Sequence, residues 1–329
     1  LQLGSHLMTT RAFAAAAAAI SVLTAIPASA EYPERALRIV VPFAPGGNID
    51  ITARTIAPGL SELLGQTVVV DNRGGAGGRL GTEMVAKAAP DGYTLLMGSS
   101  GALTIPPTFA PNVPYDPLKD FAPTSLVNSV ALALVVHPSF KSKSIKEFIA
   151  LAKASPGRIT LASAGSGTNS HLAGELFQLQ SGTKFIHVPY KGGAPALIDV
   201  MGGQVEFTFD QLSSSVPFIR AGKIRALGIT ALERSALLPE IPTIHEAGLR
   251  GFEASTYTGI MLPAAAPKDV VQKVHATLIR VLERPATKEA FAKLGADVLK
   301  STPEEFARKL KADLGKWAEV KKRADIRID

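Results

Sequence analysis

Cysteine is absent from the 329-residue sequence. Its absence excludes disulfide bonds, thiolate nucleophiles and cysteine-ligated metal sites, and also the lipid-modified cysteine that tethers many exported bacterial binding proteins. Aromatic residues are scarce, at 6%, and a chain rich in alanine, valine and glycine instead suits an α/β fold. After the first thirty residues no apolar run is long enough to cross a bilayer, so we expect no transmembrane helix.

The first thirty residues are expected to be removed from the folded protein. Residues 1–7, LQLGSHL, are typical of an expression-tag remnant. A basic start at Arg11, an apolar run over residues 12–26 and the small residues at 28–30 follow, which is the pattern of a cleaved secretory signal peptide. A membrane anchor is the alternative, but the run is short for a span and no basic cluster follows it. We predict an exported, periplasmic chain without a lipid anchor.

The formal net charge is +7, and the basic residues are scattered except in the last predicted helix. This distribution favours anionic ligands in general and does not indicate a nucleic-acid-binding surface. The six histidines occur without an H-x-x-x-H pair or a carboxylate cluster. The sequence therefore predicts neither a metal site nor a cofactor, and no nucleic-acid partner.

Strand-like apolar runs alternate with helical patterns along most of the chain. The runs at residues 37–43, 67–72 and 93–98 are continuously apolar over most of their length, which is typical of a parallel sheet covered on both faces. Two further runs, at residues 125–136 and 256–263, can carry the chain from one such unit to another and back. A proline-rich loop is expected between residues 106 and 117.

The predicted fold class is therefore α/β, with two lobes, each a mostly parallel sheet flanked by helices, joined by a hinge. The hinge is expected in the two crossing runs, around residues 128–131 and 255–259. After Pro267 only helices are expected. The predicted boundaries are residues 31–130 for the first part of lobe 1, 131–254 for lobe 2, and 255–329 for the return to lobe 1.

Each predicted lobe has a strand that ends in a turn of glycine and small polar residues before a helix. These turns are PGGN at residues 45–48 and GSGTNS at residues 165–170. Backbone N–H groups at a helix N-terminus bind anions, and ligands of open α/β sheets bind at the carboxyl ends of strands. We expect the two turns to face each other across a cleft, with Asp50 in the first turn of its helix. Ser99, Tyr190 and Asp210 also follow strands and are candidate binding residues.

Other chemistries match the sequence less well. The glycine run at residues 72–81 lacks the third glycine of the dinucleotide-binding pattern, because Leu80 stands there, and is interpreted as a tight loop near the cleft mouth. Ser166 and His171 suggest a hydrolase, but the G-x-S-x-G spacing and a third triad partner are missing.

Several stretches in order resemble the Bug family of periplasmic receptors for tripartite tricarboxylate transporters. They include VVPFAPGGNIDITAR at residues 40–54, HVPYKGGAPALIDVMGGQVEFTFD at 187–210 and LPEIPTIHEAG at 238–248. The resemblance implies a two-lobed flytrap fold that holds a carboxylate between its lobes and delivers it to an inner-membrane permease. Gly74 and Tyr257 depart from the residues that many relatives have, proline and tryptophan.

The resemblance also implies which loops hold the carboxylate, largely through backbone groups, hydroxyls and ordered waters. The implied residues are Phe43, Ala44, Gly46, Gly47 and Asn48 in the first loop, and Ser166, Gly167, Thr168, Asn169 and Ser170 in the second. We therefore expect a monomeric receptor that binds a small organic carboxylate without reaction. A periplasmic sensor subunit and, less well supported, a secreted serine hydrolase remain the alternatives, and the sequence leaves the carboxylate unidentified.

Overall fold

The computed structural model describes residues 32–110 and 112–323. The predicted tag remnant and the predicted signal peptide lie outside these residues. The chain divides into two compact units, residues 1–34 and 35–329, and all the elements that follow belong to the second. Within the described residues, no helix combines the length and the apolar character needed to cross a membrane.

The described residues contain one mixed sheet of ten strands, in the order β2-β1-β3-β9-β4-β7-β5-β6, with β8 and β10 also paired to β4. Most strands are short and apolar, and the two long ones are the predicted crossing runs. The strands are β1 (Leu37–Val41), β2 (Val68–Asn72), β3 (Thr94–Ser99), β4 (Phe121–Val136), β5 (Ile159–Ser163), β6 (Phe185–Pro189), β7 (Phe207–Gln211), β8 (Arg225–Ile229), β9 (Ser255–Pro263) and β10 (Ala296–Val298).

The outer strands pair in parallel, as the continuous apolar runs predict: β1 with β2 and β3, and β5 with β6 and β7. The central strands are antiparallel. Residues 121–131 of β4 pair with β9, whereas residues 132–136 of the same strand pair with β7. One strand thus passes from one half of the sheet into the other. We call the half around β1–β3 lobe 1 and the half around β5–β8 lobe 2.

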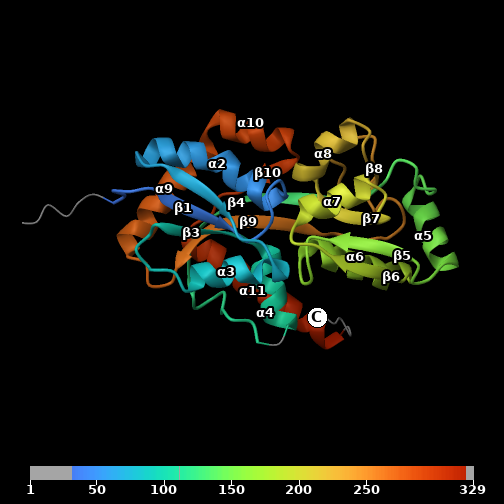
Figure 1. Cartoon of the computed structure of the whole chain (residues 1–329), viewed down its shortest axis with the longest axis horizontal. Helices are drawn as coiled ribbons and strands as arrows, with labels where there is room; N and C mark the ends of the chain where they lie inside the picture. Colours follow the sequence, from blue (N-terminus) through green and yellow to red (C-terminus); the bar gives the residue numbers. More distant parts are fainter. Residues whose placement is uncertain (1–31, 111, 324–329) are drawn as a thin grey trace, which may run out of the picture. The chain divides into compact units, whose positions relative to one another are not determined.

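Helices cover both halves of the sheet, and Figure 1 shows those of lobe 2 in green and yellow and those of lobe 1 in blue, teal, orange and red. The C-terminal helix α11 packs against α4 and β4. The helices are α2 (Asn48–Leu64), η1 (Ala76–Gly78), α3 (Arg79–Ala86), α4 (Ser100–Phe109), α5 (Ile145–Ala154), α6 (Asn169–Ser181), α7 (Gly193–Met201), α8 (Leu212–Arg220), α9 (Lys268–Glu283), α10 (Pro285–Lys293) and α11 (Pro303–Arg323).

Helix α4 corrects the prediction of a loop around its prolines. Pro106 and Pro107 lie inside the helix, where a proline removes one backbone hydrogen bond and crowds the preceding turn. The carbonyl that Pro106 leaves without its helical donor belongs to Ala102, and it accepts a bond of 2.5 Å from the Tyr115 hydroxyl. Ser99 caps the start of the helix by accepting from the Ala102 N–H. A distant side chain thus satisfies the backbone group that the proline would otherwise have left unpaired.

The prediction of helices alone after Pro267 is also wrong, because β10 pairs with β4 there. This strand has only three residues, too few for a periodic signal in the sequence.

Candidate ligand-binding site

A cavity lies between the two lobes at the point where four helices begin. It holds about 370 Å³ of empty space, part of which is open to solvent. Gly47, Asn48 and Ile49 come from the start of α2, and Gly193 from the start of α7. Ser99 and Gly101 come from the start of α4, and Thr168 and Asn169 from the start of α6; Phe43, Ala164, Gln211 and Thr256 complete the lining.

Asn48 is the polar side chain of lobe 1 best placed for a ligand. It is 2% exposed, and its Oδ1 accepts a hydrogen bond of 2.6 Å from the Ser213 hydroxyl of lobe 2. Its Nδ2 has no hydrogen-bond partner among the described residues, although it is buried and the residue lines the cavity. A buried donor without a partner costs free energy, and a ligand acceptor in the cavity would remove that cost.

The turn before α2 differs from the prediction in one detail. The Gly46 N–H, expected to face the ligand, donates instead to Oδ2 of Asp50 at 2.8 Å. Arg54 and Asn72 also donate to this carboxylate. Asp50 therefore sits in the first helical turn and serves local donors, as predicted, but it occupies one of the backbone groups that the glycines were expected to offer.

The turn before α6 is held by its own polar groups. Thr168 donates its hydroxyl hydrogen to the Gly165 carbonyl at 2.7 Å and accepts from the His171 N–H at 3.4 Å. The Gly167 N–H donates to Nδ1 of His171 at 3.2 Å. These bonds fix the loop at the start of α6, where Thr168 and Asn169 line the cavity.

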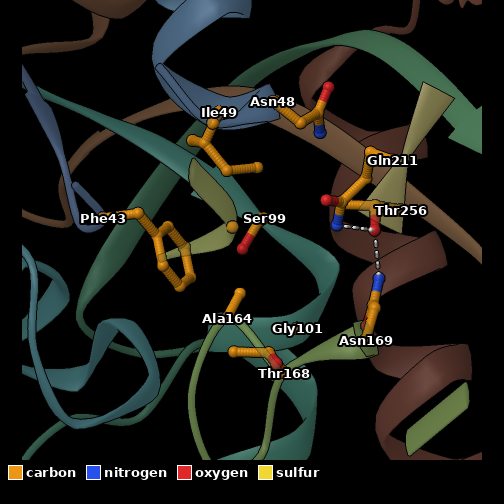
Figure 2. Close-up of a pocket in the computed structure, with 12 residues that line it drawn as sticks. Phe43, Asn48, Ile49, Ser99, Gly101, Ala164, Thr168, Asn169, Gln211 and Thr256 are labelled. Atoms are coloured by element: carbon orange, nitrogen blue, oxygen red, sulfur yellow. Dashed lines mark hydrogen bonds between the residues drawn. The ribbon is translucent and has the colours of Figure 1, made fainter. Parts of the chain in front are cut away.

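Asn169 connects this turn to lobe 1 and to the crossing strand. Its Nδ2 lies 2.6 Å from the Ser100 hydroxyl, 2.9 Å from the Ser255 carbonyl and 2.9 Å from the Thr256 hydroxyl. Gln211 donates to the same Thr256 hydroxyl at 3.2 Å, and Figure 2 shows these three side chains along one side of the cavity. Phe43 and Ile49 lie on the opposite side and supply apolar surface.

The lobes are closed upon each other. The Ala44 N–H of lobe 1 donates to the Lys191 carbonyl of lobe 2 at 3.0 Å. The glycine-rich loop between β2 and α3, interpreted above as lying near the cleft mouth, meets the loop before α6. A Cβ placed on Gly77 would lie 2.1 Å from the Ser166 carbonyl oxygen.

The electrostatics of the cavity come from the backbone, because none of its lining residues is charged. Each helix N-terminus carries about half a positive charge from its aligned peptide dipoles. Four such ends meet here, together with hydroxyl and amide donors. The arrangement can stabilise a small anion and orient it, but it does not provide a charged acid, base or nucleophile.

The cavity brings together six of the predicted site residues and leaves seven outside its lining. Tyr190 donates its hydroxyl hydrogen to Asp199 at 2.6 Å, and Asp210 accepts from the Ser214 hydroxyl at 2.6 Å. The six lining residues are Phe43, Gly47, Asn48, Ser99, Thr168 and Asn169, and the seven others are Ala44, Gly46, Ser166, Gly167, Ser170, Tyr190 and Asp210.

The sequence contained signals for some of the lining residues that the prediction omitted. Gly193 follows a strand and a glycine and opens a helix, which is the pattern used to find the other two turns. Gln211 follows Asp210 in β7, and since neighbouring side chains of a strand point to opposite faces, only one of the two can face the cavity. Gly101 required recognition of α4, and Ile49, Ala164 and Thr256 carried no chemical signal.

Asp210 should make folding stability depend on pH. Burial raises its pKa to about 7, against the hydrogen bonds from Ser214 and the Gln211 backbone. Between about pH 4 and this pKa the unfolded chain loses a proton that the folded chain keeps, so the stability conferred by protonated Asp210 falls as pH rises. We expect Asp210→Asn to gain stability relative to wild type over this range, by at most about 1.4 kcal/mol per pH unit.

Urea unfolding of both proteins at about pH 4 and about pH 8 measures this difference. His187, whose pKa burial lowers to about 4, contributes equally to both proteins. A variant that loses stability relative to wild type as the pH rises would mean that Asp210 is ionised in the fold.

Ser166 and His171 do not form the pair that a hydrolase would need. Nδ1 of His171 accepts from Gly167, and its Nε2 faces Glu175 at 3.5 Å. Elsewhere in the described residues, the Ser163 hydroxyl lies 2.6 Å from Nε2 of His187, but Ser163 is fully buried and offers no access to a substrate. The Ser139 hydroxyl lies 2.7 Å from Nδ1 of His137 in an exposed loop, and neither residue lines the cavity between the lobes.

Comparison with known proteins places this geometry in context. The family model for the tripartite tricarboxylate transporter family receptor matches residues 52–326. BugT of Bordetella pertussis is 40% identical over 298 residues, which cover 90% of this chain and 91% of BugT.

Two solved structures with bound ligands are similar over nearly the whole chain. MatC from Rhodopseudomonas palustris, with bound malate, is 34% identical with a TM-score of 0.84 and covers 88% of this chain and 99% of its own. Rpa4515 from R. palustris, with adipate, is 34% identical with a TM-score of 0.87 and covers 90% and 99%.

Proposed function

Because the chain belongs to the tripartite tricarboxylate transporter receptor family, we propose that it captures a small organic carboxylate between its lobes and delivers it to the membrane permease of such a transporter. The observation that carries the proposal is the convergence of four helix N-termini on a cavity without charged side chains. A carboxylate gains charge-assisted hydrogen bonds there and meets no carboxylate of the protein in the lining.

One carboxylate oxygen is placed to accept from Nδ2 of Asn48, the buried donor that has no partner among the described residues. The backbone N–H groups at the starts of α2 and α6 supply further donors. Phe43 and Ile49 cover the apolar part of the ligand. Ser166, Gly167 and Ser170 act through the loop that they form, and Asp210 acts from beneath Gly193, whose Cβ would lie 2.9 Å from Oδ1 of Asp210.

The ligand class is a small mono- or dicarboxylate, with malate and adipate as the first candidates because two relatives carry them. Binding involves no covalent step, since the lining holds no charged acid, base or paired nucleophile.

The hinge lies where β4 changes partners, near residue 131, and at the start of β9 near residue 255. We assign residues 31–130 and 255–329 to lobe 1 and residues 131–254 to lobe 2. The mature protein is a monomer in the periplasm, exported by a cleaved signal peptide and not lipid-anchored, and it does not bind nucleic acid.

A thermal-shift screen tests the proposal. We expect malate, adipate or a related carboxylate to raise the melting temperature by several degrees, since a ligand at about a hundred times its dissociation constant stabilises the fold by about 2.7 kcal/mol. The uncharged diamide of each acid is the matched control and should produce a much smaller shift. A panel of mono-, di- and tricarboxylates without any stabilising member would contradict the assignment.

A further inference from the structure

A second cavity lies on the other side of β9 from the ligand-binding site. It is bounded by α6 of lobe 2 and α11 of lobe 1 and holds about 1130 Å³ of empty space, part of it open to solvent. We call it the rear cavity. In β9, Thr256 faces the ligand-binding site, whereas its neighbours Ser255 and Tyr257 face the rear cavity, as the alternation of a strand requires. Of the described residues, Asn169 alone lines both.

Tyr257 gives the rear cavity a buried polar group. The residue is 5% exposed, and its hydroxyl forms no hydrogen bond of normal length with a described residue. Burial, together with the charge of Asp313 and a long contact between the hydroxyl and the Asp313 carboxylate, raises the pKa of Tyr257 far above its usual range, so the hydroxyl keeps its proton. A buried hydroxyl with only this long contact can donate to a closer acceptor.

The walls of the rear cavity are mainly apolar. Leu172 and Leu176 come from α6, and Trp317 from α11. Leu179 lies at the rim and is 68% exposed, which is unusual for a leucine and leaves apolar surface for a ligand to cover.

Charged groups at the rim select among anions. The Lys309 ammonium nitrogen lies 3.7 Å from Oδ2 of Asp313 and 4.5 Å from the centre of the Tyr257 ring. The Lys316 ammonium nitrogen lies over the Trp317 ring, 5.5 Å from its centre. With Glu253, the lining has two positive and two negative side chains, so its charges cancel. A polyanion gains little from such a field, whereas a single carboxylate can use directed bonds from Tyr257 and Lys316.

We propose that the rear cavity is a second binding site, for a monocarboxylate with a large apolar body such as a medium-chain fatty acid. The carboxylate accepts hydrogen bonds from the Tyr257 hydroxyl and the Lys316 ammonium group, and the chain lies along the leucines of α6 and the Trp317 ring. This site is separate from the proposed carboxylate site between the lobes and takes a different class of ligand.

Trp317 is the only tryptophan in the sequence, so its fluorescence reports directly on the rear cavity. We expect octanoate to change this fluorescence with a saturable dependence on concentration in the wild-type chain. Acetate, which lacks the apolar body, and octanol, which lacks the carboxylate, should both bind more weakly.

Variants locate the site. Tyr257→Phe keeps the ring and removes only the hydroxyl, and should weaken octanoate binding by about three- to tenfold, as expected for one hydrogen bond. Lys316→Gln should weaken it by about two- to fivefold, as for a partly exposed charge pair. Lys311→Gln removes an exposed lysine of the same helix that lies outside the cavity and should leave octanoate binding unchanged.

Gly47→Val separates the two sites, because it fills the cavity between the lobes and leaves the rear cavity intact. Octanoate binding that persists in this variant supports the rear site, and this result does not depend on whether malate or adipate binds. Loss of octanoate binding in Gly47→Val, equal affinity in wild type and Tyr257→Phe, or a fluorescence change that never saturates in a folded wild-type chain would each overturn the proposal.

Discussion

Alanine at position 77 is expected to weaken carboxylate binding by about a hundredfold or more, although Gly77 does not line the cavity. Its Cβ would lie 2.1 Å from the Ser166 carbonyl oxygen, so the two loops can no longer meet as they do in the closed arrangement. Ligand bonds from one lobe are then lost or lengthened, and each hydrogen bond to a charged group contributes about 1.5 to 3 kcal/mol. Calorimetry with the carboxylate that stabilises the wild type best measures the loss.

Gly65 provides a matched control for the backbone. Its φ of 69° is close to the 64° of Gly77. The left-handed conformation therefore costs an alanine about 1 to 2 kcal/mol at either position. Outside its immediate neighbours, no atom lies within 4 Å of the point that the alanine methyl group would occupy. Gly65→Ala should therefore lower stability and leave affinity unchanged. Equal affinities of Gly77→Ala and wild type would show that binding does not require this contact between the loops.

Aspartate in place of Asn169 should weaken binding by about a thousandfold. The amide nitrogen now donates toward Ser100, Ser255 and Thr256, and a carboxylate oxygen in its place would face the Ser255 carbonyl, from which it now lies 2.9 Å away, without a hydrogen to share. The new negative charge also lies on the lining of a cavity that binds an anion. Two like charges about 4 Å apart repel by about 4 kcal/mol near a protein surface.

Gln180→Glu adds the same charge to the same helix at an exposed position outside both cavities. It should change the affinity measured by calorimetry little, because solvent screens an exposed charge at that distance. If Asn169→Asp and Gln180→Glu both bind the carboxylate as tightly as wild type, the Asn169 side chain does not take part in ligand binding.

The sequence predicted the parts of the fold that depend on local pattern. The strands β1, β2 and β3 and the helices between them follow from continuous apolar runs and glycine turns, and their parallel pairing follows from that pattern. The sequence did not predict α4, because the helix accommodates Pro106 through the Tyr115 hydroxyl, which reaches back to the Ala102 carbonyl from the loop after the helix. Three-residue β10 likewise exists through its partner β4 and has no periodicity of its own.

The candidate site divides in the same way. Helix starts that follow strands can be predicted from the sequence. Gly47, Asn48, Thr168 and Asn169 were predicted in this way, and the same pattern applies to Gly193. The hydrogen bonds that each group makes could not be predicted. Asp50 takes the Gly46 N–H, and the register of β7 turns Gln211 and not Asp210 toward the cavity. Both outcomes depend on a single side-chain orientation, which composition and periodicity do not determine.

The position of β9 between β3 and β4 has a consequence for the order in which the molecule can fold. The strands of lobe 2 all come from residues 132–229, a continuous stretch in which closing each loop costs little entropy. The sheet of lobe 1 stays open until residues 255–263 arrive, and Ser301 then bonds to both Ser125 and Leu126. Lobe 2 can therefore fold before the C-terminal residues that complete lobe 1 are in place. A fragment ending before residue 255 should keep the structure of lobe 2 and expose the unpaired edges of β3 and β4 to aggregation.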